Sequence, residues 1–185
     1  TIREPYCLMT TASADAPLKG LAVLLRAIAS LRSSYPDIRL ALVGRPKPGG
    51  DTEKLIASLG LGNVVESFKG ISHEEMVQKY AIASVAVVPS IYEGFGLPAV
   101  EAMACGVPLV STDGGALAEV VEDAGLVVPA GDSQALAAAI RQLFEDDQLR
   151  DDYASRGLSR AEQHFCWNRC AERMEAYYRE CIAAC

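Results

Sequence analysis

Residues 85–106 read VAVVPSIYEGFGLPAVEAMACG, and this stretch predicts both the fold class and the place of the functional site. The run 85–88 is apolar and rich in β-branched residues, which is typical of a strand buried on both faces. Pro98, followed by small and helix-forming residues, indicates the first turn of a helix. A glycine-bearing loop joins the two. In a parallel sheet, such a joint directs free backbone N–H groups and the positive helix end toward a ligand.

The rest of the chain alternates between short apolar strands and helical segments. Besides 85–88, we expect strands at 6–10, 38–43, 63–68, 107–111 and 125–128. We expect helices at 19–34, 51–59 with Asp51 as its cap, 72–83, from 98, 116–121, from 132 with Asp132 or Ser133 as its cap, 148–164 and 168–183. Because parallel neighbours require helical crossovers, this order predicts an α/β fold: a doubly wound, mostly parallel, six-stranded Rossmann-like sheet with C-terminal helices.

Length and charge limit the possible functions. The 185 residues, half of them hydrophobic, are enough for one domain at 1–185, with a sheet core to about 146 and terminal helices from about 147. With 24 acidic and 17 basic side chains, the net charge is −7, so nucleic acid is not expected as a partner. No apolar run is long enough to span a bilayer and no cleavable signal is recognisable, so we expect a cytoplasmic protein.

Common site motifs are missing from the sequence. The first strand–helix turn lacks the Gly-x-Gly-x-x-Gly pattern of nicotinamide enzymes, and the chain has no Gly-x4-Gly-Lys-Ser/Thr phosphate loop. The cysteines and histidines lack zinc-site spacing, and there is no serine nucleophile elbow. What remains for chemistry is Glu93, the loop 94–97, and Glu101 eight residues after the first carboxylate.

This Glu-loop-Glu arrangement resembles the Glu-x7-Glu signature of family 4 (group 1) glycosyltransferases, retaining enzymes of the GT-B fold. The resemblance extends to Lys19-Gly20, to Val43-Gly44 and to the glycine-rich turn before Ala116. It implies that the chain is the C-terminal, donor-binding half of a GT-B fold, and that an N-terminal acceptor-binding domain of the same polypeptide lies outside it. It also implies transfer of a sugar from a nucleoside diphosphate sugar without a metal or other cofactor. Peripheral membrane association through the missing domain is open.

The same resemblance assigns roles to individual residues. Glu93, the expected catalytic residue, would accept hydrogen bonds from the donor sugar, and Glu101 would accept from the ribose. Lys19 would contact the diphosphate, and the nucleobase would lie near 68–70. The family arginine is absent, since Ser13 stands in its place, and Arg45 is the candidate substitute. The full set of expected donor-binding residues is Lys19, Gly44, Arg45, Glu93, Gly94, Phe95, Gly96, Leu97 and Glu101.

Other interpretations stay open at this point. Glu101 alone is compatible with an ordinary exposed helix residue favoured by the positive helix end, and Phe95 suits packing better than base stacking. The whole chain is also compatible with a non-catalytic nucleotide-binding or protein-interaction module, or with a GT-B sugar-nucleotide epimerase. The cysteines at 166, 170, 181 and 185 fall on one helical stripe, which favours core or interface over a metal site. Because the acceptor site is expected elsewhere, we expect the isolated chain to bind nucleotide with very little turnover.

Overall fold

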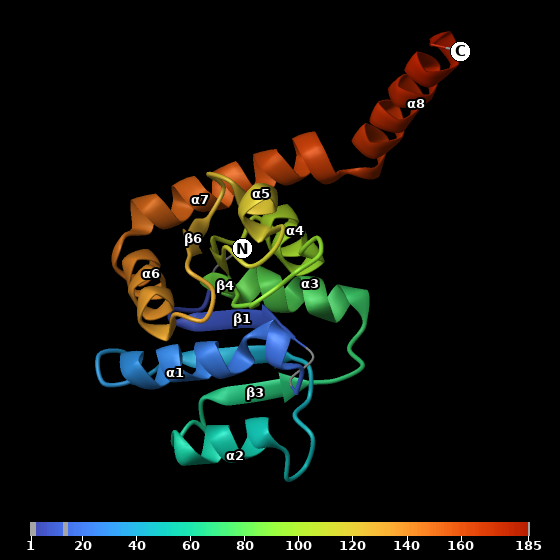
Figure 1. Ribbon diagram of the computed structural model, residues 1–185. Coiled ribbons are helices and arrows are strands. Elements are labelled where there is room, and N and C mark those ends of the chain that lie inside the picture. Colours follow the sequence, from blue (N-terminus) through green and yellow to red (C-terminus); the bar gives the residue numbers. More distant parts are fainter. Residues whose placement is uncertain (1–2, 13–14, 185) are drawn as a thin grey trace.

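A computed structural model describes residues 3–12 and 15–184. It contains a six-stranded, all-parallel sheet with the strand order β3-β2-β1-β4-β5-β6 (Figure 1). The strands are β1 (Cys7–Thr11), β2 (Arg39–Val43), β3 (Val65–Phe68), β4 (Val85–Val88), β5 (Leu109–Thr112) and β6 (Leu126–Val128). The doubly wound α/β fold expected from the sequence is confirmed.

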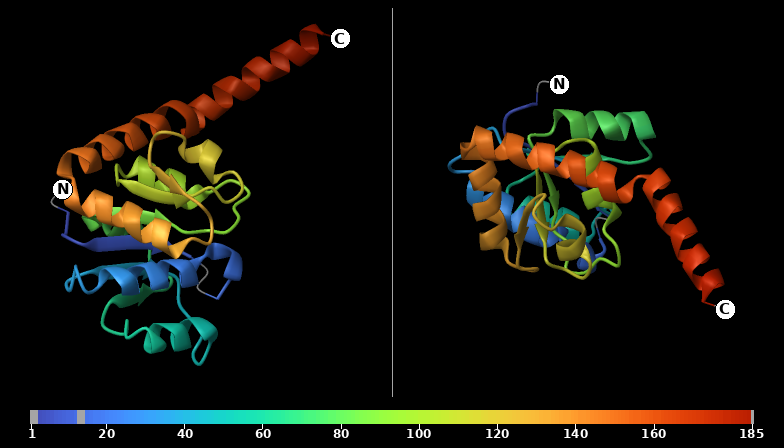
Figure 2. Two further views of the ribbon diagram at one scale, coloured as in Figure 1. Left: turned by 60° about the vertical axis from the view of Figure 1, so that its left-hand side comes forward. Right: turned by 90° about the horizontal axis from the view of Figure 1, so that it is seen from above.

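Helices cover both faces of the sheet (Figures 1 and 2). One core lies under α1 (Leu21–Leu31), α2 (Asp51–Ser58) and α6 (Ser133–Glu145). A second core lies under α3 (His73–Ile82), α4 (Leu97–Ala104) and α5 (Leu117–Val121). Because both faces are covered, β4 is buried at all four of its residues, as its continuous apolar sequence predicts.

One predicted helix start and one predicted helix cap are wrong. The helix expected from Lys19 begins only at α1, because Gly20 has a φ of +65° and ends a separate 3₁₀ turn, Pro17–Lys19. Lys19 therefore lies in a connecting turn and not in the helix. Asp51 does not cap α2 either, since the N-cap is the extended residue Gly50 and Asp51 is already helical. The predicted capping box at 72–75 is confirmed. Of the two cap candidates for α6, Asp132 is the N-cap and Ser133 is the first helical residue.

The C-terminal helices pack differently from one another. Helix α7 (Asp147–Arg160) contacts the first core through Leu149 and Tyr153 and continues into a π-helical turn, Ala161–Phe165, that contacts the second. Helix α8 (Trp167–Ala183) has no buried residue and projects away from the sheet (Figures 1 and 2). Within the described ranges, no helix combines the length and hydropathy that a bilayer span requires.

The cysteine stripe does not belong to a core. Cys166, Cys170 and Cys181 are exposed free thiols, whereas Cys185 lies outside the described residues. The physical reason is that α8 projects from the domain, so neither of its faces is covered by the described part of the chain. The core interpretation of these cysteines is therefore wrong, and the interface interpretation stays a prediction.

Candidate functional site

Three loops meet at the carboxyl edge of the sheet, where the strand order reverses between β1 and β4. Residues 17–20 follow β1, residues 89–97 follow β4, and residues 113–116 follow β5. Open parallel sheets bind ligands at such a switch point, because the neighbouring crossovers leave on opposite faces and open a crevice. The two carboxylates singled out by the sequence lie in and just after the second of these loops.

Gly20 brings the first loop directly onto the second. A Cβ built on Gly20 would lie 1.7 Å from the carbonyl oxygen of Pro89, and the positive φ of this residue also favours glycine. The backbone N–H of Ile91 donates to the carbonyl of Leu18 at 2.8 Å, which joins the same two loops. This close approach places the side chain of Lys19 beside Glu93.

The third loop holds the backbone of Glu93. The Glu93 N–H donates to the carbonyl of Gly114 at 3.3 Å, and the Glu93 carbonyl accepts from the Ala116 N–H at 3.0 Å. A Cβ on Gly115 would lie only 2.3 Å from that same carbonyl. The glycine-rich turn noted in the sequence therefore permits a close backbone clamp on the residue that carries the carboxylate.

The side chain of Glu93 is buried and oriented. Its Oε1 lies 2.7 Å from Lys19 Nζ and accepts a hydrogen bond of 2.8 Å from the Ser90 hydroxyl. The Lys19 side chain is 33% exposed and that of Glu93 is 10% exposed, so the ion pair lies at the boundary between protein and solvent. Both contacts use Oε1. Across the described residues, Oε2 makes no hydrogen bond and is available to a ligand.

Glu101, on α4, is held through one oxygen as well. The hydroxyl of Tyr80 lies 3.3 Å from Glu101 Oε2 and 3.5 Å from the carbonyl oxygen of Pro98. Tyr80 is buried, and this burial, followed by the nearby Glu101 charge, raises the pKa of the phenol above its ordinary value. Tyr80 therefore stays protonated and donates its hydrogen bond. The half-buried Glu101 is not a fully solvated helix residue.

A groove of about 850 Å³ opens beside Lys19, along the carboxyl ends of β1, β2 and β3. Four basic residues line it together with Asp15, whose carboxylate accepts from the Lys47 N–H at 2.7 Å. Although the chain carries a net charge of −7, this groove is basic and suits a phosphate-bearing ligand. The basic residues are Lys19, Arg45, Lys47 and Lys69.

The structure brings most of the predicted site residues to this edge. Lys19, Gly44 and Arg45 line the groove, and Gly96 is the N-cap of α4 with a φ of +99°. Within the described part of the chain, the N–H groups of residues 94–96 donate no hydrogen bond, so they are available to an anion. Leu97 is the exposed first residue of α4.

Phe95 and Ser13 need separate mention. Phe95 is 47% exposed, and its ring meets the ring of Phe165 edge to face, with centroids 5.9 Å apart. This contact agrees with the predicted packing role and links the loop to the π-helical turn. Ser13, the position of the absent family arginine, lies outside the described residues. Arg45 is exposed at the groove, so its place is compatible with the predicted substitution.

Sequence reasoning missed several contributors to the site. Ser90 gave a weak local signal, because it ends the buried strand segment only three residues before Glu93. Lys47 follows β2 at the same sheet edge, so its place was inferable from strand order. Tyr80 gave no signal, since 21 residues separate it from Glu101 and only the packing of α3 against α4 brings them together.

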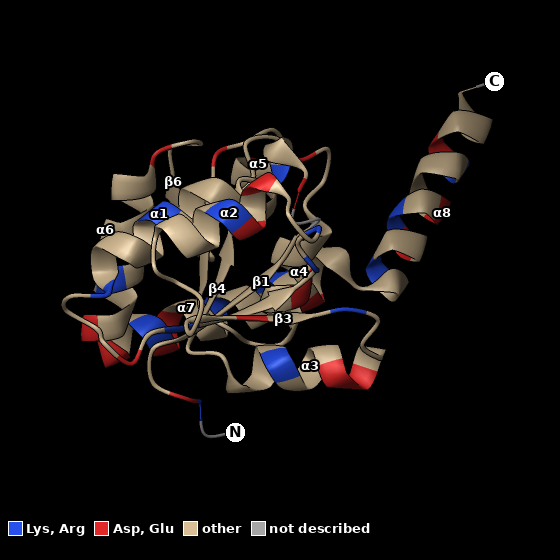
Figure 3. Cartoon of the chain, turned by 90° about the horizontal axis from the view of Figure 1, so that it is seen from below, with Lys and Arg blue, Asp and Glu red and all other residues tan. Residues whose placement is uncertain are grey.

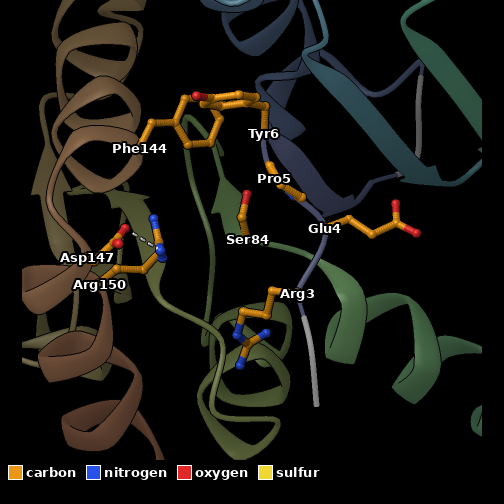
Figure 4. Close-up of a pocket in the computed structure, with 8 residues that line it drawn as sticks. All are labelled: Arg3, Glu4, Pro5, Tyr6, Ser84, Phe144, Asp147 and Arg150. Carbon is orange, nitrogen blue, oxygen red and sulfur yellow. Dashed lines mark hydrogen bonds and ion pairs between the residues drawn. The ribbon is translucent and has the colours of Figure 1, made fainter.

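A second cavity, of about 230 Å³, lies at the opposite edge of the sheet (Figure 4). Its two guanidinium groups are already engaged: Arg3 donates to the carbonyls of Ala83 at 2.9 Å and Gly106 at 2.5 Å. Arg150 pairs with Asp147 at 2.6 Å, as the dashed line in Figure 4 shows. These contacts tie the ends of α3 and α4 to the N-terminal segment, which indicates a structural role.

Comparison with known proteins places this geometry in a family. The sequence model described as "Glycosyl transferases group 1" matches residues 2–160. The chain is 44% identical over 180 residues to the MMP alpha-(1->4)-mannosyltransferase of Mycolicibacterium hassiacum, covering 95% of this chain and 43% of that protein. The chain thus spans less than half the length of this relative.

Solved structures show the same fold. Anabaena HepE in complex with UDP aligns with a TM-score of 0.81 and 28% identity, over 93% of this chain and 49% of that one. The C-terminal domain of a group 1 glycosyl transferase family protein (LpcC) from Francisella tularensis aligns with a TM-score of 0.75 and 25% identity, over 90% of this chain and 89% of that one. The chain belongs to the group 1 (family 4) glycosyltransferases and matches the C-terminal half of their GT-B fold.

Proposed function

We propose that this chain is the donor-binding domain of a retaining glycosyltransferase that transfers a sugar from a nucleoside diphosphate sugar to an acceptor. The observation that carries the proposal is the cluster of Lys19, Ser90 and Glu93 beside a basic groove at the switch point of the sheet. It joins a cation suited to a diphosphate with an oriented carboxylate suited to sugar hydroxyls. Family membership supports the transferase over the epimerase alternative.

The proposed donor lies across the three loops. Its diphosphate contacts Lys19 and the N–H groups of residues 94–97 at the positive end of α4. The sugar donates hydroxyl hydrogen bonds to Glu93, the ribose donates to Glu101, and the base lies near residues 68–70. As the glycosidic bond breaks, negative charge grows on the diphosphate, and prearranged cations and N–H groups stabilise it without a metal ion.

Calorimetric titration with UDP, GDP and ADP, and with their glucose and mannose conjugates, tests this proposal. We expect one of the nucleotides to bind and its sugar conjugate to bind more tightly. Mannose conjugates are included because of the 44% identity to a mannosyltransferase. The sugar-dependent gain should vanish in Glu93→Ala and persist in Glu180→Ala, which alters an exposed glutamate on α8. Failure of all three nucleotides to bind would favour the non-catalytic interaction module.

We also propose that catalysis needs an N-terminal acceptor-binding domain of the same polypeptide. Support comes from the 43% coverage of the relative and from α8, where five apolar residues recur with a 3-4-3-4 spacing on one exposed face. These residues are Trp167, Cys170, Met174, Tyr177 and Cys181. Charged residues of both signs also lie along α8 (Figure 3), so the apolar stripe is the part of this helix suited to packing. Robust transferase activity of the isolated chain, in a radiolabelled-donor assay, would contradict this proposal.

A further inference from the structure

Each of the two carboxylates has one oxygen held by the hydroxyl of a buried residue. Ser90 donates to Glu93 Oε1 at 2.8 Å, and Tyr80 donates to Glu101 Oε2 at 3.3 Å. Ser90 and Tyr80 are each only 2% exposed, so bulk water does not compete for their hydroxyl groups. In both carboxylates, the second oxygen makes no hydrogen bond to any residue within the described ranges. The same arrangement therefore occurs twice, on different elements.

We propose that Ser90 and Tyr80 are positioning residues with separate tasks: Ser90 orients Glu93 for the donor sugar, and Tyr80 orients Glu101 for the ribose. This inference rests on the proposed function, because it assumes that a nucleoside diphosphate sugar occupies the site. Neither residue touches the donor. Each acts by restricting the rotation of a carboxylate, so that the unpaired oxygen faces the ligand before the ligand arrives.

Ser90 is needed because Lys19 has two competing partners. In the free protein, Lys19 and Ser90 both contact Glu93 Oε1. A bound diphosphate, with more negative charge than one carboxylate, attracts the Lys19 ammonium and weakens its hold on Glu93. The Ser90 hydroxyl then remains to fix Oε1. Its own backbone is fixed, since the Ser90 carbonyl accepts a hydrogen bond from the buried hydroxyl of Thr112.

Tyr80 is well placed because the helices that carry the pair are tied together. The Arg3 guanidinium donates to the carbonyls of Tyr80 at 3.3 Å and Ala83 at 2.9 Å, at the end of α3. It also donates to Gly106 at 2.5 Å, just beyond α4. This bridge fixes α3 relative to α4, and hence the phenol relative to Glu101. Burial raises the pKa of Tyr80, so the phenol keeps its proton through the neutral range.

Two binding differences separate the two tasks. The sugar gain is the ratio of affinities for a nucleoside diphosphate sugar and the bare diphosphate. The ribose gain is the ratio of the affinity for the nucleoside diphosphate to the affinity for its 2′,3′-dideoxy form. In Ser90→Ala, we expect the sugar gain to fall about tenfold, as for loss of one hydrogen bond to a charged group, with the ribose gain unchanged. In Tyr80→Phe, we expect the ribose gain to fall severalfold, since this contact is longer, with the sugar gain unchanged.

Matched controls come from the opposite edge of the sheet. Ser84→Ala removes a buried serine hydroxyl that donates to the Cys7 carbonyl at 2.9 Å. Tyr35→Phe removes a tyrosine–glutamate hydrogen bond of 2.6 Å to Glu145. Both controls should change the unfolding free energy without changing either gain. Calorimetry uses whichever of UDP, GDP and ADP binds the unaltered chain most tightly, with its sugar and dideoxy forms.

The outcomes are distinguishable. The inference is supported if Ser90→Ala lowers only the sugar gain and Tyr80→Phe lowers only the ribose gain. If Ser90→Ala and Tyr80→Phe behave like the controls, or lower both gains alike, the inference is overturned while the proposed function stands. If no nucleoside diphosphate binds the unaltered chain, the proposed function fails and the inference fails with it.

Discussion

Replacing Glu93 by glutamine should shift the affinities for a nucleoside diphosphate and for its sugar conjugate in opposite directions. In the free protein, the Glu93 carboxylate holds the Lys19 ammonium at 2.7 Å, and the diphosphate must compete for this cation. Glutamine keeps the shape but removes the charge and its repulsion of the phosphates. Because Lys19 is 33% exposed, we expect this change to favour the bare diphosphate by only about 0.5–1 kcal/mol, a roughly two- to fivefold gain.

For the sugar conjugate, the affinity lost with the hydrogen bond to Glu93 should exceed the affinity gained from the removed repulsion. A hydrogen bond to a charged group contributes about 1.5–3 kcal/mol, so the sugar-dependent advantage should fall roughly 10- to 150-fold. Calorimetry with both ligands, on the unaltered chain, on Glu93→Gln and on Glu180→Gln as a surface control, measures both effects. Equal weakening of both ligands would refute the competition between Glu93 and the diphosphate. Survival of the full sugar advantage would refute the assignment of Glu93 to the sugar.

Three further predictions follow from the same contacts. Lys19→Met should weaken nucleoside diphosphate binding about tenfold and make the affinity less dependent on salt concentration. Calorimetric titrations at several salt concentrations measure both effects. An unchanged slope of affinity against salt concentration would contradict the role of Lys19. Gly20→Ala should lower the free energy of unfolding, measured by urea denaturation, by about 3 kcal/mol or more, because the new Cβ would lie 1.7 Å from the Pro89 carbonyl oxygen. Gly62→Ala, with open space around the Cβ, should change this free energy by less than about 0.5 kcal/mol. Equal effects of the two substitutions would contradict the close approach of Gly20 to Pro89. Because the pKa of Tyr80 is raised in the folded protein, the folded protein keeps a proton that the unfolded chain loses above about pH 10, and the stability that this group contributes is lost as the pH rises beyond that value. The urea midpoint of unfolding, measured between about pH 9 and 11, should therefore decline less in Tyr80→Phe than in the unaltered chain. Parallel declines in the two proteins would contradict this prediction.

The fold and the central loop were predictable because their signals are local. The alternation of apolar strands with amphipathic helices predicts a parallel sheet, and the strand order confirms it. The spacing of Glu93 and Glu101 around a glycine loop is likewise visible along the chain. The resemblance to a family then supplied roles that spacing alone does not contain. Those roles remain proposals that the binding experiments test.

What the sequence did not reveal depends on contacts between distant segments. The break between the 3₁₀ turn and α1 results from the approach of Gly20 to Pro89, which no local pattern encodes. The pairing of Tyr80 with Glu101 requires two helices to be packed first. For α8, periodicity predicted a stripe of cysteines but not what covers it, and the described part of the chain leaves the described cysteines of that stripe exposed.

A crystal structure of this chain with a bound nucleoside diphosphate tests the central claim most directly. We expect the phosphates to lie within hydrogen-bonding distance of Lys19 Nζ and of the N–H groups of residues 94–97. We also expect the ribose to contact Glu101 and the distance between Lys19 Nζ and Glu93 Oε1 to increase from 2.7 Å. A nucleotide bound elsewhere would contradict the proposed donor site. So would one bound in the groove with the Lys19–Glu93 pair intact and the N–H groups of residues 94–97 without a bond to phosphate.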